Sequence, residues 1–155
     1  MKLKRYRAYS LVEVIIIVMI IGIFAVIAVP RFNRACILKN KAETTAGKIV
    51  TDLRLARRLA ISDAANNTEG FELKMVGSYP FTAYEIENVD TEETYASYTL
   101  NSGTNVSCPS GTRFIFGPLG NLITGSGSSI IVSAGGGSFT ITIISATGTI
   151  KCVEN

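Results

Sequence analysis

The sequence contains no histidine and only three cysteines. The absence of histidine removes the commonest general base and the commonest metal ligand. Cys36, Cys108 and Cys152 have no C-x-x-C spacing, which argues against a zinc site or a thioredoxin-type centre. We therefore expect no metal and no cofactor.

Catalytic patterns are also missing. Carboxylates are plentiful after the first third of the chain, yet no pair of them accompanies a nucleophile or a metal motif. The glycine clusters Gly125-Ser-Gly127 and Gly135–Gly137 precede no helix and no Gly-Lys-Ser/Thr, so they are interpreted as turns and not as phosphate loops. We expect no catalytic residues and no enzyme.

The positive net charge of +3 is concentrated at one end. Four of the 15 basic residues lie in the first eight positions, and the remaining 11 are outnumbered by the 12 acidic residues. The body of the chain should therefore have no general attraction for nucleic acid or for anionic lipid.

The longest pattern is an apolar run from Leu11 to Val29 that only Glu13 interrupts. At about 19 residues, it is long enough to cross the hydrocarbon core of a bilayer. A carboxylate inside such a run costs roughly 2.5–3.5 kcal/mol on membrane-insertion scales. We expect Glu13 to have a partner, which indicates assembly in or from a membrane.

The octapeptide MKLKRYRA lies directly before the apolar run. Such a basic cluster should stay in the cytoplasm and place the C-terminal domain outside it. Cleavage after the run, as in an ordinary secretory signal, is the less favoured alternative because a charged helical pattern follows Pro30. Outside the cytoplasm, Cys108 and Cys152 are expected to form a disulfide, which leaves Cys36 as a small buried residue.

The segment RYRAYSLVEVIIIVMIIGIFAVIAVPRF resembles the class III leader and N-terminal helix of type IV pilins and type II secretion pseudopilins. In that family an aspartic peptidase cuts before the apolar run and N-methylates the new first residue. The resemblance places the cut between Ala8 and Tyr9, where the family usually has glycine and phenylalanine. It makes Glu13 the fifth residue of the mature chain, and Gly22 and Pro30 match the family's glycine and proline positions.

Two roles are open for Glu13. In the first, it neutralises the terminal ammonium group of a neighbouring subunit and sets the axial register between subunits. In the second, Ser10-Leu-Val-Glu13 forms a capping box, in which Glu13 bonds backbone N–H groups of its own helix. Pro30 is expected to kink or open the helix, and Gly22 weakens it further. In filaments of the family that this segment resembles, the stretch between such residues can lose helical order, so the resemblance makes Gly22–Pro30 the candidate region.

Past Pro30 the spacing predicts an amphipathic helix that ends near Ser62. Its apolar stripe consists of Leu38, Ala42, Ala46, Ile49, Leu53, Ala56 and Ala60. Strand-like runs separated by Gly, Pro, Asn and Ser follow at 71–76, 82–86, 95–100, 113–116, 129–132, 139–144 and 149–153. The predicted fold is α+β, with a long N-terminal helix, first transmembrane and then amphipathic, packed on an antiparallel β-sheet domain as in type IV pilins.

The expected parts are a cytoplasmic leader (1–8), a transmembrane and filament-core helix (9–30) and a periplasmic or extracellular globular domain (31–155). The C-terminal half has a looser resemblance to the GspH/FimT group of minor pseudopilins and pilins. It rests on DLRLARRLAISDA, Phe116-Gly-Pro-Leu-Gly120 and Gly148-Thr-Ile-Lys151.

These resemblances imply a structural subunit of a type IV pilus-like filament, in the first place a minor pseudopilin of a type II secretion system. The alternatives are a major or minor type IV pilin, or a FimT-like DNA-uptake pilin. The tail Lys151–Asn155 has one lysine and one glutamate, and Arg54, Arg57 and Arg58 are interpreted as a solvated helix face, so nucleic acid is not an expected partner.

The expected partners are other subunits, the prepilin peptidase and the inner-membrane assembly platform. The expected location is the bacterial inner membrane, followed by a periplasmic pseudopilus or an extracellular pilus.

Overall fold

The structure is a computed structural model that describes residues 9–109, 111–125, 127 and 129–155. The chain forms two compact units, Met1–Ala35 and Cys36–Asn155. One helix, α1 (Leu11–Ser62), contributes to both, and its backbone is helical through Gly22 and Pro30. The predicted loss of helical order at Gly22–Pro30 concerns an assembled filament and stays a prediction. Within the described part of the chain, no helix meets the length and hydropathy that a membrane span requires.

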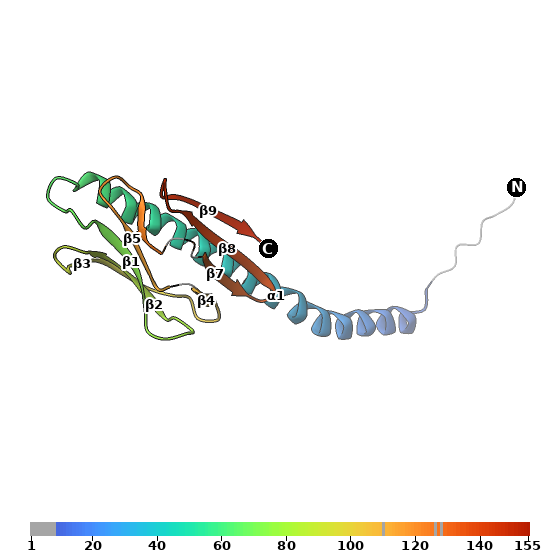
Figure 1. The fold of residues 1–155 in the computed structure, drawn as a ribbon. Coiled ribbons are helices and arrows are strands. Elements are labelled where there is room, and N and C mark those ends of the chain that lie inside the picture. The colour runs from blue at the N-terminus through green and yellow to red at the C-terminus, as the bar shows by residue number, and fades with distance from the viewer. Residues whose placement is uncertain (1–8, 110, 126, 128) are drawn as a thin grey trace, which may run out of the picture. The chain divides into compact units, whose positions relative to one another are not determined.

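The strands that follow α1 form two antiparallel sheets (Figure 1). Sheet A has the order β3-β2-β1-β5-β6, and sheet B has the order β4-β7-β8-β9. The bounds are β1 (Phe71–Val76), β2 (Ala83–Asn88), β3 (Thr94–Thr99), β4 (Asn105–Ser107), β5 (Arg113–Phe116), β6 (Leu122–Thr124), β7 (Ser129–Ala134), β8 (Gly137–Ile144) and β9 (Thr149–Glu154).

The register of each sheet places apolar side chains in rows. In sheet A, Leu73 of β1 lies opposite Ile86 of β2 on one side and Phe114 of β5 on the other. In sheet B, Ile141 of β8 lies opposite Ile130 of β7. All five of these side chains are fully buried, so each sheet has one apolar face.

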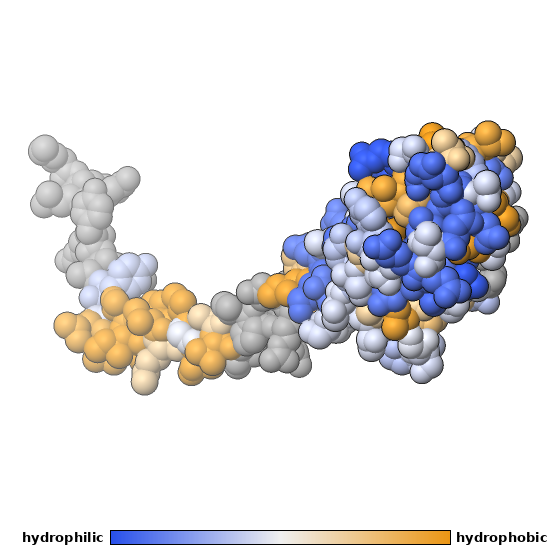
Figure 2. All heavy atoms as spheres, turned by 90° about the vertical axis from the view of Figure 1, so that its left-hand side faces the viewer, coloured by the Kyte–Doolittle hydropathy of each residue, from blue (hydrophilic) through white to orange (hydrophobic). Residues whose placement is uncertain are grey.

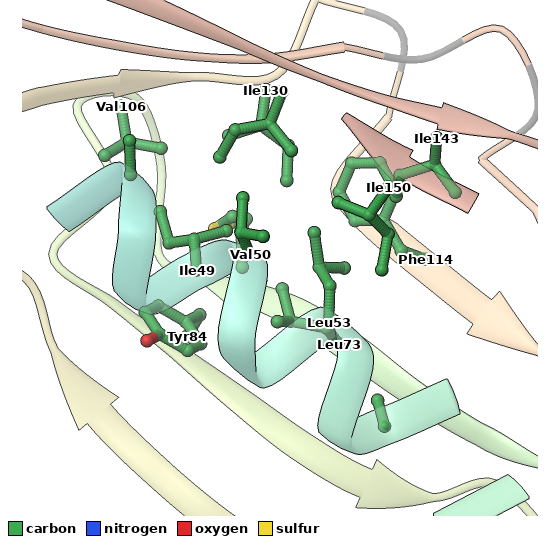
Figure 3. Close-up of a cluster of buried hydrophobic side chains, with 14 of the residues drawn as sticks. Ile49, Val50, Leu53, Leu73, Tyr84, Val106, Phe114, Ile130, Ile143 and Ile150 are labelled. Atoms are coloured by element: carbon green, nitrogen blue, oxygen red, sulfur yellow. The ribbon is translucent and has the colours of Figure 1, made fainter. Parts of the chain in front are cut away.

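The hydrophobic core lies in the second unit, where α1 packs against both sheets (Figure 3). Ile49 lies beside Tyr84 of β2, whereas Val50 points towards Ile130 of β7. Neighbouring residues of this helical turn therefore contribute to both sheets. The predicted apolar stripe is buried from Ala42 onwards, and its first member, Leu38, is half-buried.

The structure does not support the predicted disulfide, because all three cysteines are free thiols. Cys108 directly follows β4 and Cys152 lies in β9, at opposite edges of sheet B with β7 and β8 between them. Three strand spacings of about 4.8 Å separate the two backbones by roughly 14 Å, whereas a disulfide needs Cα atoms within about 7 Å. The prediction that Cys36 is buried is also wrong: its side chain is exposed, because it precedes the buried part of the stripe at Ala42.

Candidate assembly surface

The first part of α1 is apolar on every side. From Leu11 to Val26 its large apolar side chains are between 46% and 75% exposed. Figure 2 shows hydrophobic residues over the visible face of this segment. A helix that is apolar all round is stable only where a protein core or a membrane covers it, and a large exposed apolar surface marks an interaction site. This segment is therefore the candidate assembly surface.

Glu13 lies in the first turn of the helix, and its side chain is exposed. The backbone N–H groups of Glu13 and Val14 donate to the carbonyl oxygen of Ser10, at 3.0 and 3.3 Å. These bonds begin the helix. Among the described residues, however, the Glu13 carboxylate forms no hydrogen bond and no ion pair, so the side-chain bonds of a capping box are not made. The only acidic side chain of the apolar segment thus has no partner among the described residues.

Tyr9 lies two positions before α1, and its side chain is 75% exposed. It lies four positions before Glu13, next to the start of the apolar surface. Ala8 lies outside the described residues, so the predicted cut between Ala8 and Tyr9 and the methylation of Tyr9 stay predictions.

Gly22 creates a shallow apolar hollow on the segment. The hollow is lined by Met19, Gly22, Ile23 and Val26. A Cβ atom added at Gly22 would meet no atom within 4 Å, so nothing in the described chain requires a glycine here for space. A missing side chain on an exposed apolar helix does allow a second helix to approach closely.

The polar side chains buried in the second unit hold the domain together. Arg113 donates from Nε and Nη2 to the two carboxylate oxygens of Glu72, at 2.7 and 2.9 Å, and Glu72 is 2% exposed. The Tyr84 hydroxyl donates to buried Asp52 at 2.5 Å, and burial, followed by that bond, raises the pKa of Tyr84. These contacts join α1 to β2 and β1 to β5.

The sequence did not indicate these pairs, because their partners lie 32 and 41 positions apart along the chain. Among the described residues there is also no group of three or more side chains that could hold a metal ion. The buried side chains Asp52 and Glu72 thus have structural partners, Tyr84 and Arg113.

The three arginines near the end of α1 have different roles. Arg54 and Arg58 are exposed, as predicted for a solvated face. Arg57 is half-buried, and its Nε donates to the carbonyl oxygen of Gly120 at 2.9 Å. Gly120 belongs to the turn between β5 and β6, and a Cβ atom on Gly148 would overlap its carbonyl oxygen. Arg57 therefore ties the helix to the turn that carries the GspH/FimT resemblance.

No protein-family model matches the sequence, and no curated protein matches it. Among solved structures, the chain is similar to the type IV minor pilin FimU of Pseudomonas aeruginosa strain PAO1, with a TM-score of 0.60 and 14% sequence identity. The similarity covers 72% of this chain and 91% of that one. It shows a shared fold, so the predicted helix packed on antiparallel β-structure, as in type IV pilins, is confirmed.

Proposed function

We propose that this chain is a structural subunit of a type IV pilus-like filament. The observation that carries the proposal is the apolar segment Leu11–Val26, exposed on every side in a chain whose pilin-like domain has its own core. All buried hydrophobic residues of the described chain lie between Ala42 and Ile150, so the apolar segment adds nothing to that core. A membrane covers this apolar segment before assembly, and neighbouring subunits cover it afterwards.

Glu13 would give such an assembly its register. In the proposed sequence of events, the peptidase cuts between Ala8 and Tyr9 and leaves a positively charged amine on Tyr9. Glu13 of one subunit then pairs with the amine of the next one, in surroundings where the low dielectric strengthens the attraction. Because an unpaired charge is costly in a low-dielectric environment, only the axial offsets between subunits that form this pair are stable.

The finer proposal is a minor pseudopilin of a type II secretion system. It is supported by the GspH/FimT resemblance, whose Phe116–Gly120 turn is fixed to α1 through Arg57. A minor pilin of a type IV pilus is the second candidate, and the fold shared with the minor pilin FimU favours it. The proposed location in the inner membrane, with the domain outside the cytoplasm, is common to both.

Substitution of Glu13 tests the proposal. The Glu13→Ala chain should be cut and inserted in the membrane like the wild type, but its amount in sheared or purified filaments should fall about tenfold or more, because its register contact is lost. Glu43→Ala is the matched control, since Glu43 is an exposed acidic residue of the same helix outside the apolar segment. Normal incorporation of Glu13→Ala would contradict the register role.

Deletion of the gene separates the two candidates. A pseudopilin role predicts that secreted proteins accumulate in the periplasm while surface pili remain. Loss of pili with normal protein export would assign the chain to the pilus instead. Wild-type chain that never appears in any filament fraction would contradict the filament proposal as a whole.

A further inference from the structure

Four of the nine Lys and Arg residues of the second unit pair with a carboxylate of the domain. Lys39 pairs with Glu154, Lys48 with Asp52, Lys74 with Glu87, and Arg113 with Glu72. Arg54 and Arg58 are both exposed, and, like Lys41, Arg57 and Lys151, neither has a carboxylate within 4 Å among the described residues.

These two arginines are four positions apart and so lie on one face of α1. Like charges at this spacing destabilise a helix. The domain therefore gains no stability from the pair, and an anionic surface of a second molecule would remove the repulsion between the two charges.

The turn between β2 and β3 presents the complementary charges. Glu92 and Glu93 are adjacent and exposed, and among the described residues neither forms an ion pair. Glu92 has a φ of 55°, a left-handed conformation that non-glycine residues rarely adopt.

Hydrogen bonds hold this turn in place. The side-chain oxygen of Asn88 accepts from the backbone N–H of Asp90 at 3.0 Å and from the amide of Asn67 at 2.7 Å. The backbone N–H of Thr68 donates to Asp90 at 2.8 Å, and the backbone N–H of Asn88 donates to the carbonyl of Glu93 at 2.9 Å. The two carboxylates are thus presented on a fixed backbone, which lowers the entropy lost on binding.

We propose that the exposed face of α1 at Arg54 and Arg58 docks the β2–β3 turn of a second copy of this chain, through Glu92 and Glu93. Two cations meet two carboxylates, and the two surfaces belong to different elements. A contact between different surfaces of identical chains is heterologous, and repetition of such a contact produces an open-ended assembly. The inference rests on the proposed filament function and adds a specific contact between globular domains.

Charge reversal tests the contact in cells with the full-length chain. R54E/R58E and E92K/E93K should each lower the amount of chain in filaments about tenfold, because like charges then face each other. The chain that carries all four substitutions should return to within about twofold of the wild type, because every contact is opposite in sign again. K41E is the control, since Lys41 lies on the same helix outside the proposed face.

Chemical cross-linking tests the same contact in purified filaments. R54K/R58K keeps both charges and supplies amines that a carbodiimide can couple directly to carboxylates. Peptides that join position 54 or 58 to position 92 or 93 of another chain should appear, and E92Q/E93Q should abolish them. A mixture of isotope-labelled and unlabelled chains identifies links between two copies.

The outcomes separate this inference from the proposed function. If the wild-type chain, R54E/R58E and E92K/E93K all enter filaments in normal amounts, the docking contact is overturned and the filament role stays intact. Failure of the fourfold variant to recover, with its unfolding curve unchanged from the wild type, would also overturn the contact. Cross-links only to other subunits would replace the second copy with a different partner and contradict the proposal.

Discussion

At the scale of single residues, Gly70 and Gly47 differ in whether the surrounding structure has room for a side chain, so they give a matched pair of substitutions. Gly70 has a φ of 92°, and a Cβ atom there would overlap the carbonyl oxygen of Phe116, so Gly70→Ala should lower the free energy of unfolding by about 2–4 kcal/mol. Gly47 lies in α1 with no atom within 4 Å of an added Cβ, so Gly47→Ala should raise it by about 0.5–1 kcal/mol. Urea unfolding measures both changes. Equal effects of the two substitutions would contradict the local geometry described for Gly70.

Arg113 should stabilise the domain mainly through Glu72. Arg113→Ala leaves the buried Glu72 carboxylate without its partner and should lower the free energy of unfolding by about 1–3 kcal/mol. The expected loss is below that of a fully buried pair because the Arg113 side chain is 52% exposed. In a Glu72→Gln background, the same substitution should cost much less. A double-mutant cycle by urea unfolding checks this, and a coupling energy near zero would show that the pair does not stabilise the fold.

The three thiols should react at different rates. Burial raises the pKa of Cys108 from 9.0 to about 12, so its reactive thiolate form is scarcer at pH 8 than that of an ordinary cysteine. Cys36 and Cys152 are exposed, and we expect iodoacetamide to modify both before Cys108. Mass spectrometry of the native chain, with urea-unfolded chain as control, measures the order. Rapid modification of Cys108 at neutral pH would contradict its placement beside the core.

At the scale of elements, prediction from the sequence succeeded where a repeated pattern was present. The end of α1 at Ser62 and the bounds of β1 and β5 are as predicted, because helical spacing and apolar runs between turn residues mark them. The strands β4 and β6 were not predicted. Each has three residues, too few to show alternation, and each exists only because a neighbouring strand pairs with it.

The pairing of distant residues could not be predicted for a related reason. Cys108 and Cys152 were expected to meet, but nothing local in the sequence shows that β7 and β8 lie between the strands that carry them. The same applies to the candidate site. The apolar segment and Glu13 could be recognised because they are continuous in the sequence. The difference between half-buried Arg57 and exposed Arg54 and Arg58 could not, because it depends on where the Gly120 turn lies.

The second unit should fold without the first. Every buried hydrophobic residue of the described chain lies between Ala42 and Ile150, and both sheets lie beyond residue 70. A chain of residues 36–155 should therefore have the same free energy of unfolding as the domain in the full-length protein, within about 0.5 kcal/mol. Chemical unfolding followed by tyrosine fluorescence measures it, with the full-length chain in detergent as reference. A much less stable fragment would mean that the apolar segment contributes to the fold.

At the scale of the whole molecule, the distribution of apolar surface predicts how the protein behaves in solution. The segment Leu11–Val26 exposes apolar side chains all round, whereas the apolar side chains of the second unit largely form a buried core. Exposed surface of this extent should associate in water, since burial of apolar area releases roughly 25 cal/mol per Å². We expect full-length chain to form large assemblies without detergent, whereas the 36–155 fragment stays monomeric.

Analytical ultracentrifugation at matched concentrations checks this difference in solution behaviour. The informative variant replaces Ile16 and Ile20, which are 52% and 48% exposed, with serine in the full-length chain. Four positions separate them, so they lie on one face of the helix. Serine at both positions would weaken the apolar contact with other chains on that face only. We expect smaller assemblies and unchanged unfolding of the domain. Full-length protein that remains monomeric in detergent-free buffer would show that the apolar segment needs no cover, and the basis for assigning it to a filament core would be lost.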